Sequence, residues 1–192
     1  QVKFSELDVA KVVDELESTR LEGLLDTSKD IFHTIMPKIG GKTIEVYQDG
    51  RYESKSFRFI DFENIHNNDF QVTVEYKVTG KETIRCDVVC FVNGIPFAII
   101  ENKKSSVGVD KAIAQLRRYQ TPEYAPKLFI YPQLLIASNT SEFLYGTTGT
   151  PAKFYASWRE RDETLEQQDA RLHTLITKHI DEPTYIQLLQ DL

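Results

Sequence analysis

The chain has 192 residues, of which 41% are hydrophobic, and a formal net charge of −6. This length and composition suit one folded domain, or one domain with an appendage, and exclude a chain too polar to form a core. No run of about 18 apolar residues occurs, and the N-terminus lacks a basic segment followed by an apolar one. We therefore expect no membrane span, no secretory signal and a cytoplasmic location.

The charge is unevenly distributed along the chain. Residues 1–30 and 159–192 are acidic, whereas the segment between them is slightly basic. The basic residues near its centre are Lys103, Lys104, Lys111, Arg117 and Arg118. A polyanionic partner is therefore compatible with the sequence despite the negative net charge.

The first part of the chain is predicted to be helical. Apolar residues at three-to-four spacing within residues 6–24 indicate two short helices, the second beginning at Ser18-Thr19. These apolar residues are Val9, Val12, Val13, Leu16 and Leu24. A further helical pattern over residues 27–36 ends at Pro37 and Gly40-Gly41.

Strand patterns dominate the middle of the chain. Residues 43–47 and 56–62 are joined by a turn at 48–51, and residues 70–78 and 84–92 are joined at 79–81, which indicates an antiparallel meander. We then expect a strand at 97–100, a helix at 109–120, and short strands at 134–137 and 142–145. Asp110 favours the start of the helix, because an acid stabilises a helix N-terminus. Residues 164–180 and 184–192 are again helical in pattern. We predict an α/β or α+β fold with a central mixed sheet flanked by helices.

Two cysteines, Cys86 and Cys90, lie four residues apart in one predicted strand. Their even spacing predicts that both point to the same face of the sheet. Because no second pair of Cys or His completes a metal site, we interpret them as buried thiols.

The segment DVVCFVNGIPFAIIENKK (87–104) joins two apolar strands at Asn93-Gly94. A simple two-residue turn would place Asp87 opposite Ile100 and send Glu101 to the other face. A longer loop or one bulge would place Asp87 directly opposite Glu101, on the face that Lys103 shares. Pro96 cannot donate a ladder hydrogen bond and favours the irregular pairing.

Two interpretations of these charges remain open. They could be strand ends that reach water. Alternatively, two carboxylates and a lysine would form a phosphodiester-hydrolysis site, because Mg²⁺ prefers carboxylate oxygens and a lysine stabilises charge on phosphate. On the helix that follows, Gln115 and Tyr119 share one face at i, i+4 spacing. Gln115 either is core filler with a satisfied amide or lines the same site with Tyr119.

The set Asp87, Glu101-Asn102-Lys103 and Gln115-x-x-x-Tyr119 resembles the core of PD-(D/E)xK nucleases with the Gln-x-x-x-Tyr extension of RecB-like nucleases. The surrounding segments resemble the N-terminal nuclease domain of the type I restriction endonuclease R subunit. They are IDFENIHNNDFQV (60–72), RCDVVCFVNGIPFAIIENKKS (85–105), AIAQLRRYQ (112–120), LLIASNTSEFLYG (134–146) and Trp158. The resemblance covers residues 30–160, and the ordered set around VNGIP makes it specific.

This resemblance implies a restriction-endonuclease-like fold and a role for each matched residue. Asp87 and Glu101 would bind Mg²⁺, Lys103 would be the catalytic lysine, and Gln115 and Tyr119 would support cleavage of double-stranded DNA. Methyltransferase and specificity subunits would be partners, and ATP would act only through a motor absent from this chain. The predicted contacts to the DNA backbone are Lys104, Lys111, Arg117 and Arg118.

The resemblance also divides the chain. Residues 1–160 would form the nuclease domain, with helices at 1–36 and the sheet core at 43–146, and residues 161–192 a helical appendage toward the motor. The segment Gly40-Gly41-Lys42-Thr43 lacks the earlier glycine of a phosphate-binding loop, so we expect the chain to be a fragment of a longer subunit.

Three positions depart from the family pattern. Asn102 stands where the family has an apolar residue, and Cys86 where it often has proline. The acidic residue of the first family helix matches none of Glu15, Glu17 and Glu22 clearly, and a chain beginning at Gln1 is expected to start downstream of it. Two alternatives follow: a catalytically degenerate docking module, or another RecB-like repair nuclease.

Overall fold

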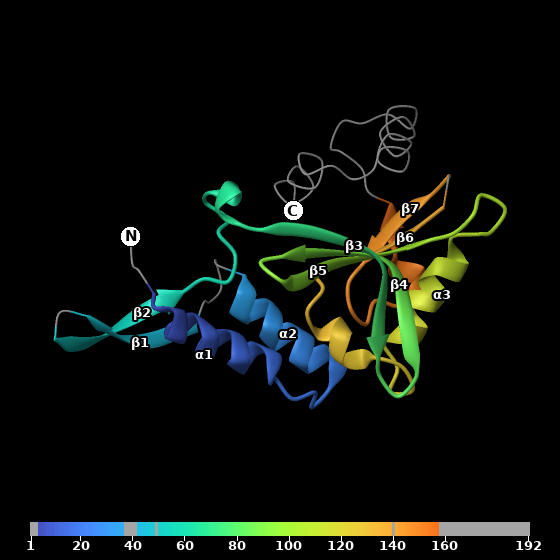
Figure 1. Ribbon diagram of the computed structural model, residues 1–192. Helices are drawn as coiled ribbons and strands as arrows, with labels where there is room; N and C mark the ends of the chain where they lie inside the picture. Colours follow the sequence, from blue (N-terminus) through green and yellow to red (C-terminus); the bar gives the residue numbers. More distant parts are fainter. Residues whose placement is uncertain (1–3, 37–41, 49, 140, 158–192) are drawn as a thin grey trace.

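The computed structural model describes residues 4–36, 42–48, 50–139 and 141–157 (Figure 1). Trp158 and the predicted helical appendage at 161–192 lie outside the described residues. Within the described part of the chain, no helix is long and apolar enough to cross a membrane.

The two N-terminal helices are α1 (Glu6–Glu17) and α2 (Leu24–Ile35). A capping box starts α1, because Ser5 and Asp8 each accept a backbone hydrogen bond from the other. The expected helix start at Ser18-Thr19 is wrong. Both hydroxyls donate back to the Glu15 carbonyl, so these residues end α1 instead of beginning α2.

Strands β1 (Lys42–Gln48) and β2 (Arg51–Phe57) form a two-stranded sheet of their own. Figure 1 shows this hairpin extending away from the main sheet. The expected strand at 56–62 is wrong, because β2 begins directly after the tight turn at Gly50 and ends at Phe57. The chain then turns at Asp61, whose carboxylate accepts hydrogen bonds from the backbone of Glu63 and Asn64.

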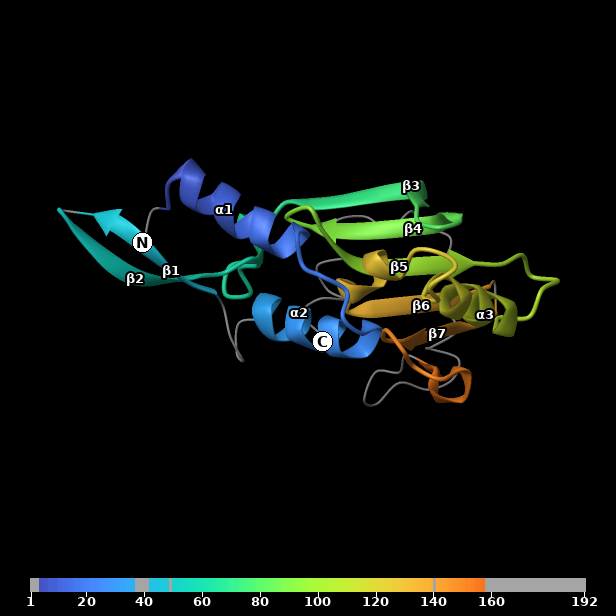
Figure 2. The same cartoon turned by 90° about the horizontal axis from the view of Figure 1, so that it is seen from below.

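The main sheet has six strands in sequence order, as Figure 2 shows for β3 to β7. Strands β5 and β6 are parallel and are connected through helix α3 (Asp110–Tyr119), whereas all other neighbours are antiparallel. The strands are β3 (Phe70–Thr79), β4 (Thr83–Val92), β5 (Ile95–Asn102), β6 (Leu134–Ser138), β7 (Phe143–Gly146) and β8 (Ala156–Ser157). The predicted α/β fold with a central mixed sheet is confirmed. The expected antiparallel meander holds for β3 and β4, whereas its first two strands form a separate sheet.

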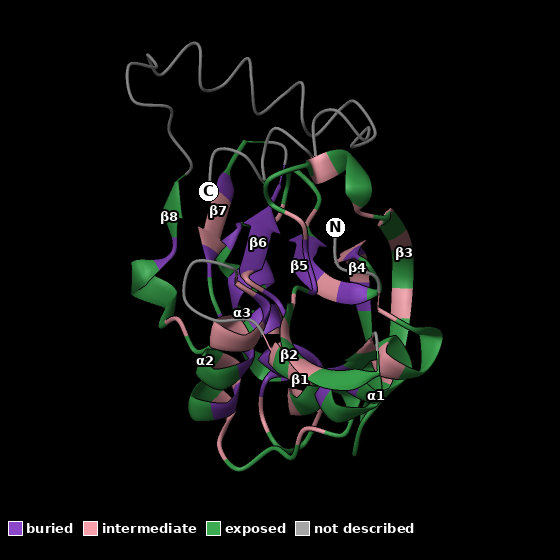
Figure 3. Cartoon of the chain, turned by 90° about the vertical axis from the view of Figure 1, so that its left-hand side faces the viewer, coloured by how far each residue is buried: buried purple, intermediate pink, exposed green. Residues whose placement is uncertain are grey.

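Two hydrophobic cores lie on the two faces of this sheet. On β6, Leu134 and Ile136 pack into the core that α1 and α2 cover, whereas Leu135 and Ala137 pack into the core beneath α3. Both faces of β6 are therefore covered, and Figure 3 shows this strand buried along its length. Three short 3-10 helices complete the described fold: Ile65–Asn67, Pro126–Ile130 and Ala152–Phe154.

The two cysteines are buried free thiols, as predicted, but they do not share a face. Cys86 belongs to the core beneath α3, and Cys90 belongs to the core beneath α1 and α2. The strict alternation of side chains fails between them, where Glu75 on the neighbouring strand adopts a φ of 53°. This local irregularity lies beside Asp87.

Candidate active site

The turn between β4 and β5 is a two-residue turn. Val92 pairs with Ile95, and Asn93 and Gly94 have φ values of 50° and 79°, as a type I′ turn requires. The Asn93 side chain donates to the carbonyl oxygen of Phe59 at 2.8 Å and accepts from the backbone of Asp69 at 2.7 Å. These bonds tie the turn to the segment that leads into β3.

A bulge follows immediately in β5. Phe91 pairs with Pro96, but Cys90 pairs with Ala98, so Phe97 is an extra residue in the ladder. Phe97 and Ala98 both pack into the core beneath α1 and α2, which shows that the alternation of faces shifts there. The structure thus combines the simple turn with the bulge, and the side chains beyond the bulge follow the irregular register.

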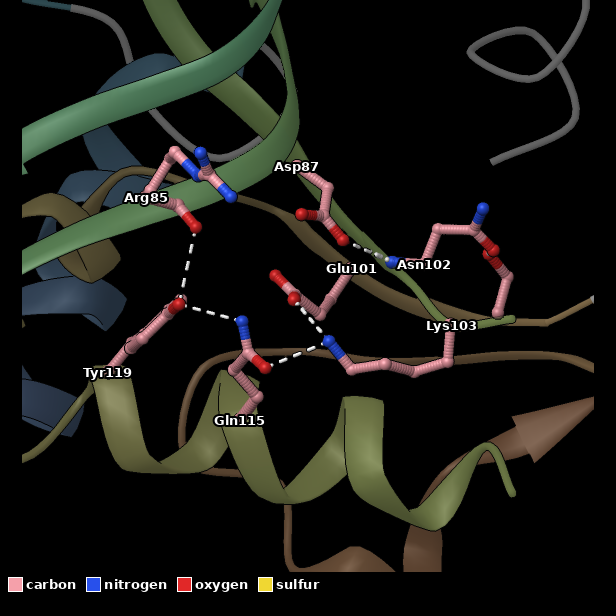
Figure 4. A network of polar contacts seen from close by, with 8 residues as sticks. Arg85, Asp87, Glu101, Asn102, Lys103, Gln115 and Tyr119 are labelled. Carbon is pink, nitrogen blue, oxygen red and sulfur yellow. Dashed lines mark hydrogen bonds and ion pairs between the residues drawn. The ribbon is translucent and has the colours of Figure 1, made fainter. Parts of the chain in front are cut away.

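That register brings the two acids together. Val88 pairs with Ile100, and one step further along the ladder Asp87 lies opposite Glu101. Figure 4 shows the two carboxylates facing each other. The backbone N–H of Asn102 donates to Oδ2 of Asp87 at 2.9 Å and holds that carboxylate toward β5.

Glu101 is buried completely, with 0% of its surface exposed. Its Oε1 accepts a hydrogen bond from Nζ of Lys103 at 2.7 Å, while its Oε2 is buried with no hydrogen-bond partner among the described residues. Burial raises the pKa of Glu101 to about 7, since the opposing effect of Lys103 is partly offset by the charge of Asp87. The positive charge of Lys103 therefore does not fully offset the cost of burying the Glu101 carboxylate.

Helix α3 supplies the second half of the arrangement. Nζ of Lys103 also donates to Oε1 of Gln115 at 2.8 Å, Nε2 of Gln115 donates to the hydroxyl of Tyr119 at 2.7 Å, and that hydroxyl donates to the carbonyl of Arg85 at 3.2 Å (Figure 4). Burial, and after it the charge of Glu101, raises the pKa of Tyr119, so the phenol keeps its proton. The Gln115 amide is satisfied by Lys103 and Tyr119, not by the core.

We call Asp87, Glu101 and Lys103 the carboxylate site, which Gln115 and Tyr119 border. Spacing in the sequence anticipated these five residues. It gave no signal for the Arg85 carbonyl, because a backbone acceptor carries no residue-type pattern. One interpretation of the sequence is that these charged residues are strand ends that reach water. It does not hold for Glu101, which is buried.

Asn102 lies beside the carboxylate site without joining it. Its side chain accepts a hydrogen bond from the hydroxyl of Ser138 on β6 at 3.0 Å. The carbonyl of Ser138 in turn accepts from the backbone of Lys103 at 2.8 Å. The polar partner that Asn102 requires is therefore supplied by the neighbouring strand, and the sequence did not identify it.

No described acid from the N-terminal helices completes the site. Glu15 forms an ion pair with Lys42 of β1, and the helix that carries it packs over the core opposite α3. Glu22 donates its backbone N–H to Thr27 at 3.3 Å. Among the described residues, no group of three or more His, Cys, Asp or Glu side chains is placed to hold a metal ion.

The predicted DNA-contacting residues do not form one uniform surface. All four side chains are exposed. Nζ of Lys111 lies 3.5 Å from the carboxylate of Asp110, whose negative charge offsets the positive charge of Lys111. The Arg118 guanidinium lies 5.8 Å from the ring centre of Tyr119, a residue that borders the carboxylate site. Burial raises the pKa of Tyr155 to about 12, and the nearby charge of Arg117 opposes this rise. Lys104 comes two residues after the end of β5.

The comparisons with known proteins agree on one family. Residues 2–154 match the model of a family described as Type I restriction enzyme R protein N terminus. The chain is 28% identical over 171 residues to the type I restriction enzyme EcoprrI endonuclease subunit of Escherichia coli, which covers 85% of this chain and 52% of that protein.

Two further relatives come from other organisms. Over 142 residues the chain is 31% identical to the putative type I restriction enzyme MjaIXP endonuclease subunit of Methanocaldococcus jannaschii, covering 71% of this chain and 13% of that protein. Over 144 residues it is 31% identical to the type I restriction enzyme SauCOLORF180P endonuclease subunit of Staphylococcus aureus, covering 70% of this chain and 15% of that protein. The chain therefore spans about half or less of the relatives that it matches.

Proposed function

This chain belongs to the family of type I restriction enzyme R protein N termini, and we propose that it is a Mg²⁺-dependent endonuclease domain that cleaves double-stranded DNA within an ATP-dependent type I restriction-modification complex. The observation that carries the proposal is the convergence of Asp87, Glu101 and Lys103, which the bulge at Phe97 makes possible. The ATP motor and the methyltransferase and specificity partners are part of this proposal, and they follow from the resemblance to type I restriction R subunits.

The donor atoms present fit Mg²⁺. The Glu101 oxygen that does not bond Lys103 points toward the Asp87 carboxylate, so two hard oxygen ligands face one space. Because the described residues offer no third ligand side chain, water and DNA phosphate would fill the remaining positions. Mg²⁺ held by Asp87 and Glu101 would polarise the phosphodiester and lower the pKa of a bound water.

Lys103 is positioned to act on the same phosphate. Two protons of its ammonium are directed to Glu101 and Gln115, which leaves the third for a phosphate oxygen or the attacking water. A fixed cation there stabilises the charge that develops on phosphate during cleavage. Gln115 and Tyr119 fix the cation through hydrogen bonds, and we assign them a positioning role.

The alternative of a degenerate docking module rested on Asn102 and on the missing upstream acid. Asn102 bonds Ser138 and leaves the contacts of Glu101 and Lys103 intact, so this departure gives no reason for lost activity. The alternative of a repair nuclease finds no support in the relatives, which carry type I restriction names. The upstream acid has no match among the described residues, so the endonuclease proposal is favoured by the intact contacts of Glu101 and Lys103 and by the names of the relatives.

The test is to replace Asp87 or Lys103 by alanine in the assembled enzyme. We expect DNA cleavage to fall by about 100-fold or more, because each change removes charge stabilisation of the transition state. ATP hydrolysis and DNA binding should persist. Both rates and the affinity are measured on the same preparation, with thermal unfolding as a check of folding.

Matched controls come from helix α2, where Asp30 and Lys29 are exposed. Asp30→Ala and Lys29→Ala change the same charges away from the site and should leave cleavage unchanged. A folded Asp87→Ala enzyme that cuts DNA at the normal rate would show that the site is wrongly assigned.

A further inference from the structure

A pocket separate from the carboxylate site lies where the end of the β3–β4 hairpin meets the segment that follows α3, two segments that lie together in Figure 1. It is a pocket of about 430 Å³. Its lining includes Tyr76, Lys81, Pro122, Tyr124 and Lys127. We call it the Tyr124 pocket.

Main-chain hydrogen bonds hold the two walls of this pocket together. The N–H of Lys81 donates to the carbonyl of Tyr124 at 3.1 Å, and the N–H of Glu82 donates to the carbonyl of Glu123 at 2.9 Å. Gly80 allows this close approach, since a Cβ at this position would lie 2.0 Å from the Tyr124 carbonyl oxygen. The pocket is thus bounded by paired backbone on both walls.

The lining joins flat aromatic surfaces to positive charge. Tyr76 and Tyr124 contribute rings, and the exposed side chains of Lys81 and Lys127 contribute ammonium groups. Outside this lining, the Arg118 guanidinium lies 5.5 Å from the ring centre of Tyr124. Aromatic rings that stack on bases, combined with cations that attract phosphates, are the components of single-strand nucleic-acid sites.

The pocket is also connected to the carboxylate site. The ring of Tyr124 lies 6.1 Å from the ring of Tyr119, whose hydroxyl accepts a hydrogen bond from Gln115 in the series that begins at Lys103. Along the sheet, Val78 of the pocket pairs with Ile84, and Asp87 lies three residues further on β4. Three residues of strand span about 10 Å, so one DNA strand can reach both places.

We propose that the Tyr124 pocket binds an unstacked nucleotide of the DNA strand that the carboxylate site cuts. The proposal rests on the proposed function and adds a substrate preference to it. Its volume suits a small ligand and not a duplex, and a base inside a duplex is stacked and cannot enter. Unpaired DNA next to the cleavage position is therefore the preferred substrate.

The test compares two fluorescent DNA probes on the full-length protein, in EDTA to prevent cleavage: a blunt duplex and the same duplex with a single-stranded tail. We expect the tailed probe to bind about ten-fold more tightly, the size of one base–aromatic stacking contact. Tyr124→Ala should remove most of this preference. Tyr124→Phe should keep it, because stacking requires the ring and not the hydroxyl.

A second pair of variants tests the pocket without replacing Tyr124, whose substitution could disturb folding. Lys127 and Lys29 are both exposed, and Lys127→Glu and Lys29→Glu change the net charge equally. We expect Lys127→Glu to reduce the preference for the tailed probe from about ten-fold to about three-fold, because it removes a cation that attracts the phosphates of the tail, and Lys29→Glu to leave the preference unchanged. Equal losses in the two variants would overturn the proposal, as would a wild-type protein that binds both probes equally.

Failure of the pocket and failure of the nuclease give different results. If the preference for the tail is absent but Asp87→Ala still abolishes cleavage, only the pocket is wrong. If the preference is present and depends on Tyr124, but Asp87→Ala cuts DNA normally, the nuclease assignment is wrong instead.

Discussion

Glu101 is the residue on which the chemistry of the site depends most. It has no exposed surface, one oxygen bonded to Lys103 and a second oxygen facing another carboxylate. A buried carboxylate in this position favours its protonated form until a cation arrives. The same feature that destabilises the metal-free protein therefore favours the binding of a divalent ion.

The pKa of Glu101, raised to about 7 from 4.5, predicts how stability depends on pH. The folded state binds the proton more tightly than the unfolded state, so the stabilising contribution is present below about pH 4.5 and is lost as the pH rises through about 7. Glu101→Gln should remove this dependence and stabilise the metal-free protein at pH 8 by on the order of 2 kcal/mol. Thermal unfolding at pH 5 and pH 8 measures it.

Adding Mg²⁺ supplies the control for this prediction. Mg²⁺ should raise the unfolding temperature of the wild-type protein at pH 8 and should have little effect on Glu101→Gln, because ligand binding stabilises only the state that binds. A variant whose stability falls with pH as steeply as that of the wild type would contradict the assigned role of Glu101.

Gln115 provides a second prediction at this scale. Gln115→Ala removes the acceptor that holds Lys103 at 2.8 Å, so we expect cleavage to slow by about 10- to 100-fold while DNA affinity is unchanged. Gln115→Glu keeps an acceptor and should recover part of the rate. The neighbouring exposed Ala114, changed to serine, is the control, and single-turnover cleavage is the measurement.

The sequence predicted these side chains better than it predicted their contacts. Spacing along β5 and α3 selected Glu101, Lys103, Gln115 and Tyr119, because residues two apart in a strand or four apart in a helix share a face. The hydrogen bond from Lys103 to Gln115 depends on where α3 packs on the sheet. That placement comes from the core beneath the helix, which no local spacing encodes.

At the scale of elements, the β4–β5 hairpin decides whether the site exists. Asn93-Gly94 forms the tight turn that its sequence favours, and Phe97 forms the bulge that returns Glu101 to the face of Asp87. The sequence left these two pairings as alternatives. The structure combines them because Pro96 has no N–H for the ladder and because Phe97 and Ala98 both pack into one core.

The turn makes a testable contribution to stability. Gly94 has a φ of 79°, and Gly94→Ala should lower the free energy of unfolding by about 1–2 kcal/mol, since a Cβ is unfavourable in this conformation. Gly50 has a φ of 81° in the β1–β2 hairpin, which forms a sheet of its own, and a Cβ would meet open space at both glycines. Gly50→Ala should therefore change global unfolding less. Chemical denaturation of both variants measures the difference, and equal losses would contradict it.

The cysteines show where a simple rule failed within a strand. Even spacing predicted one face for Cys86 and Cys90, and the structure places them in different cores. The alternation shifts beside Asp87, opposite the positive φ of Glu75. An irregularity in a neighbouring strand decides this, so the sequence of β4 alone could not reveal it.

At the scale of the whole molecule, one face of the sheet packs against the N-terminal helices and the other carries the carboxylate site. Helices α1 and α2 cover one core, while α3 covers the other and faces the carboxylate site. The β1–β2 hairpin projects beyond both (Figure 1). The sequence predicted the order of most elements, but the separation of β1 and β2 from the main sheet depends on pairings distant in sequence.

The negative net charge of −6 makes the local position of each basic residue important for DNA binding. Arg118 lies over the rings of Tyr119, which borders the carboxylate site, and Tyr124, whereas the charge of Arg117 acts near buried Tyr155. Arg118→Ala should weaken DNA binding for all sequences alike and reduce the dependence of log affinity on log salt by about 1. Arg117→Ala should have a smaller effect on both.

Affinities measured at several salt concentrations, on duplexes of two unrelated sequences, separate the two arginines. A lost phosphate contact reduces both the affinity and the number of counterions released, whereas a structural defect reduces the affinity with little change in the salt dependence. Equal changes in slope for the two variants would show that both sides of α3 face the DNA. A change confined to Arg118 places the bound strand along the surface that joins Tyr124 to Lys103, next to the two carboxylates.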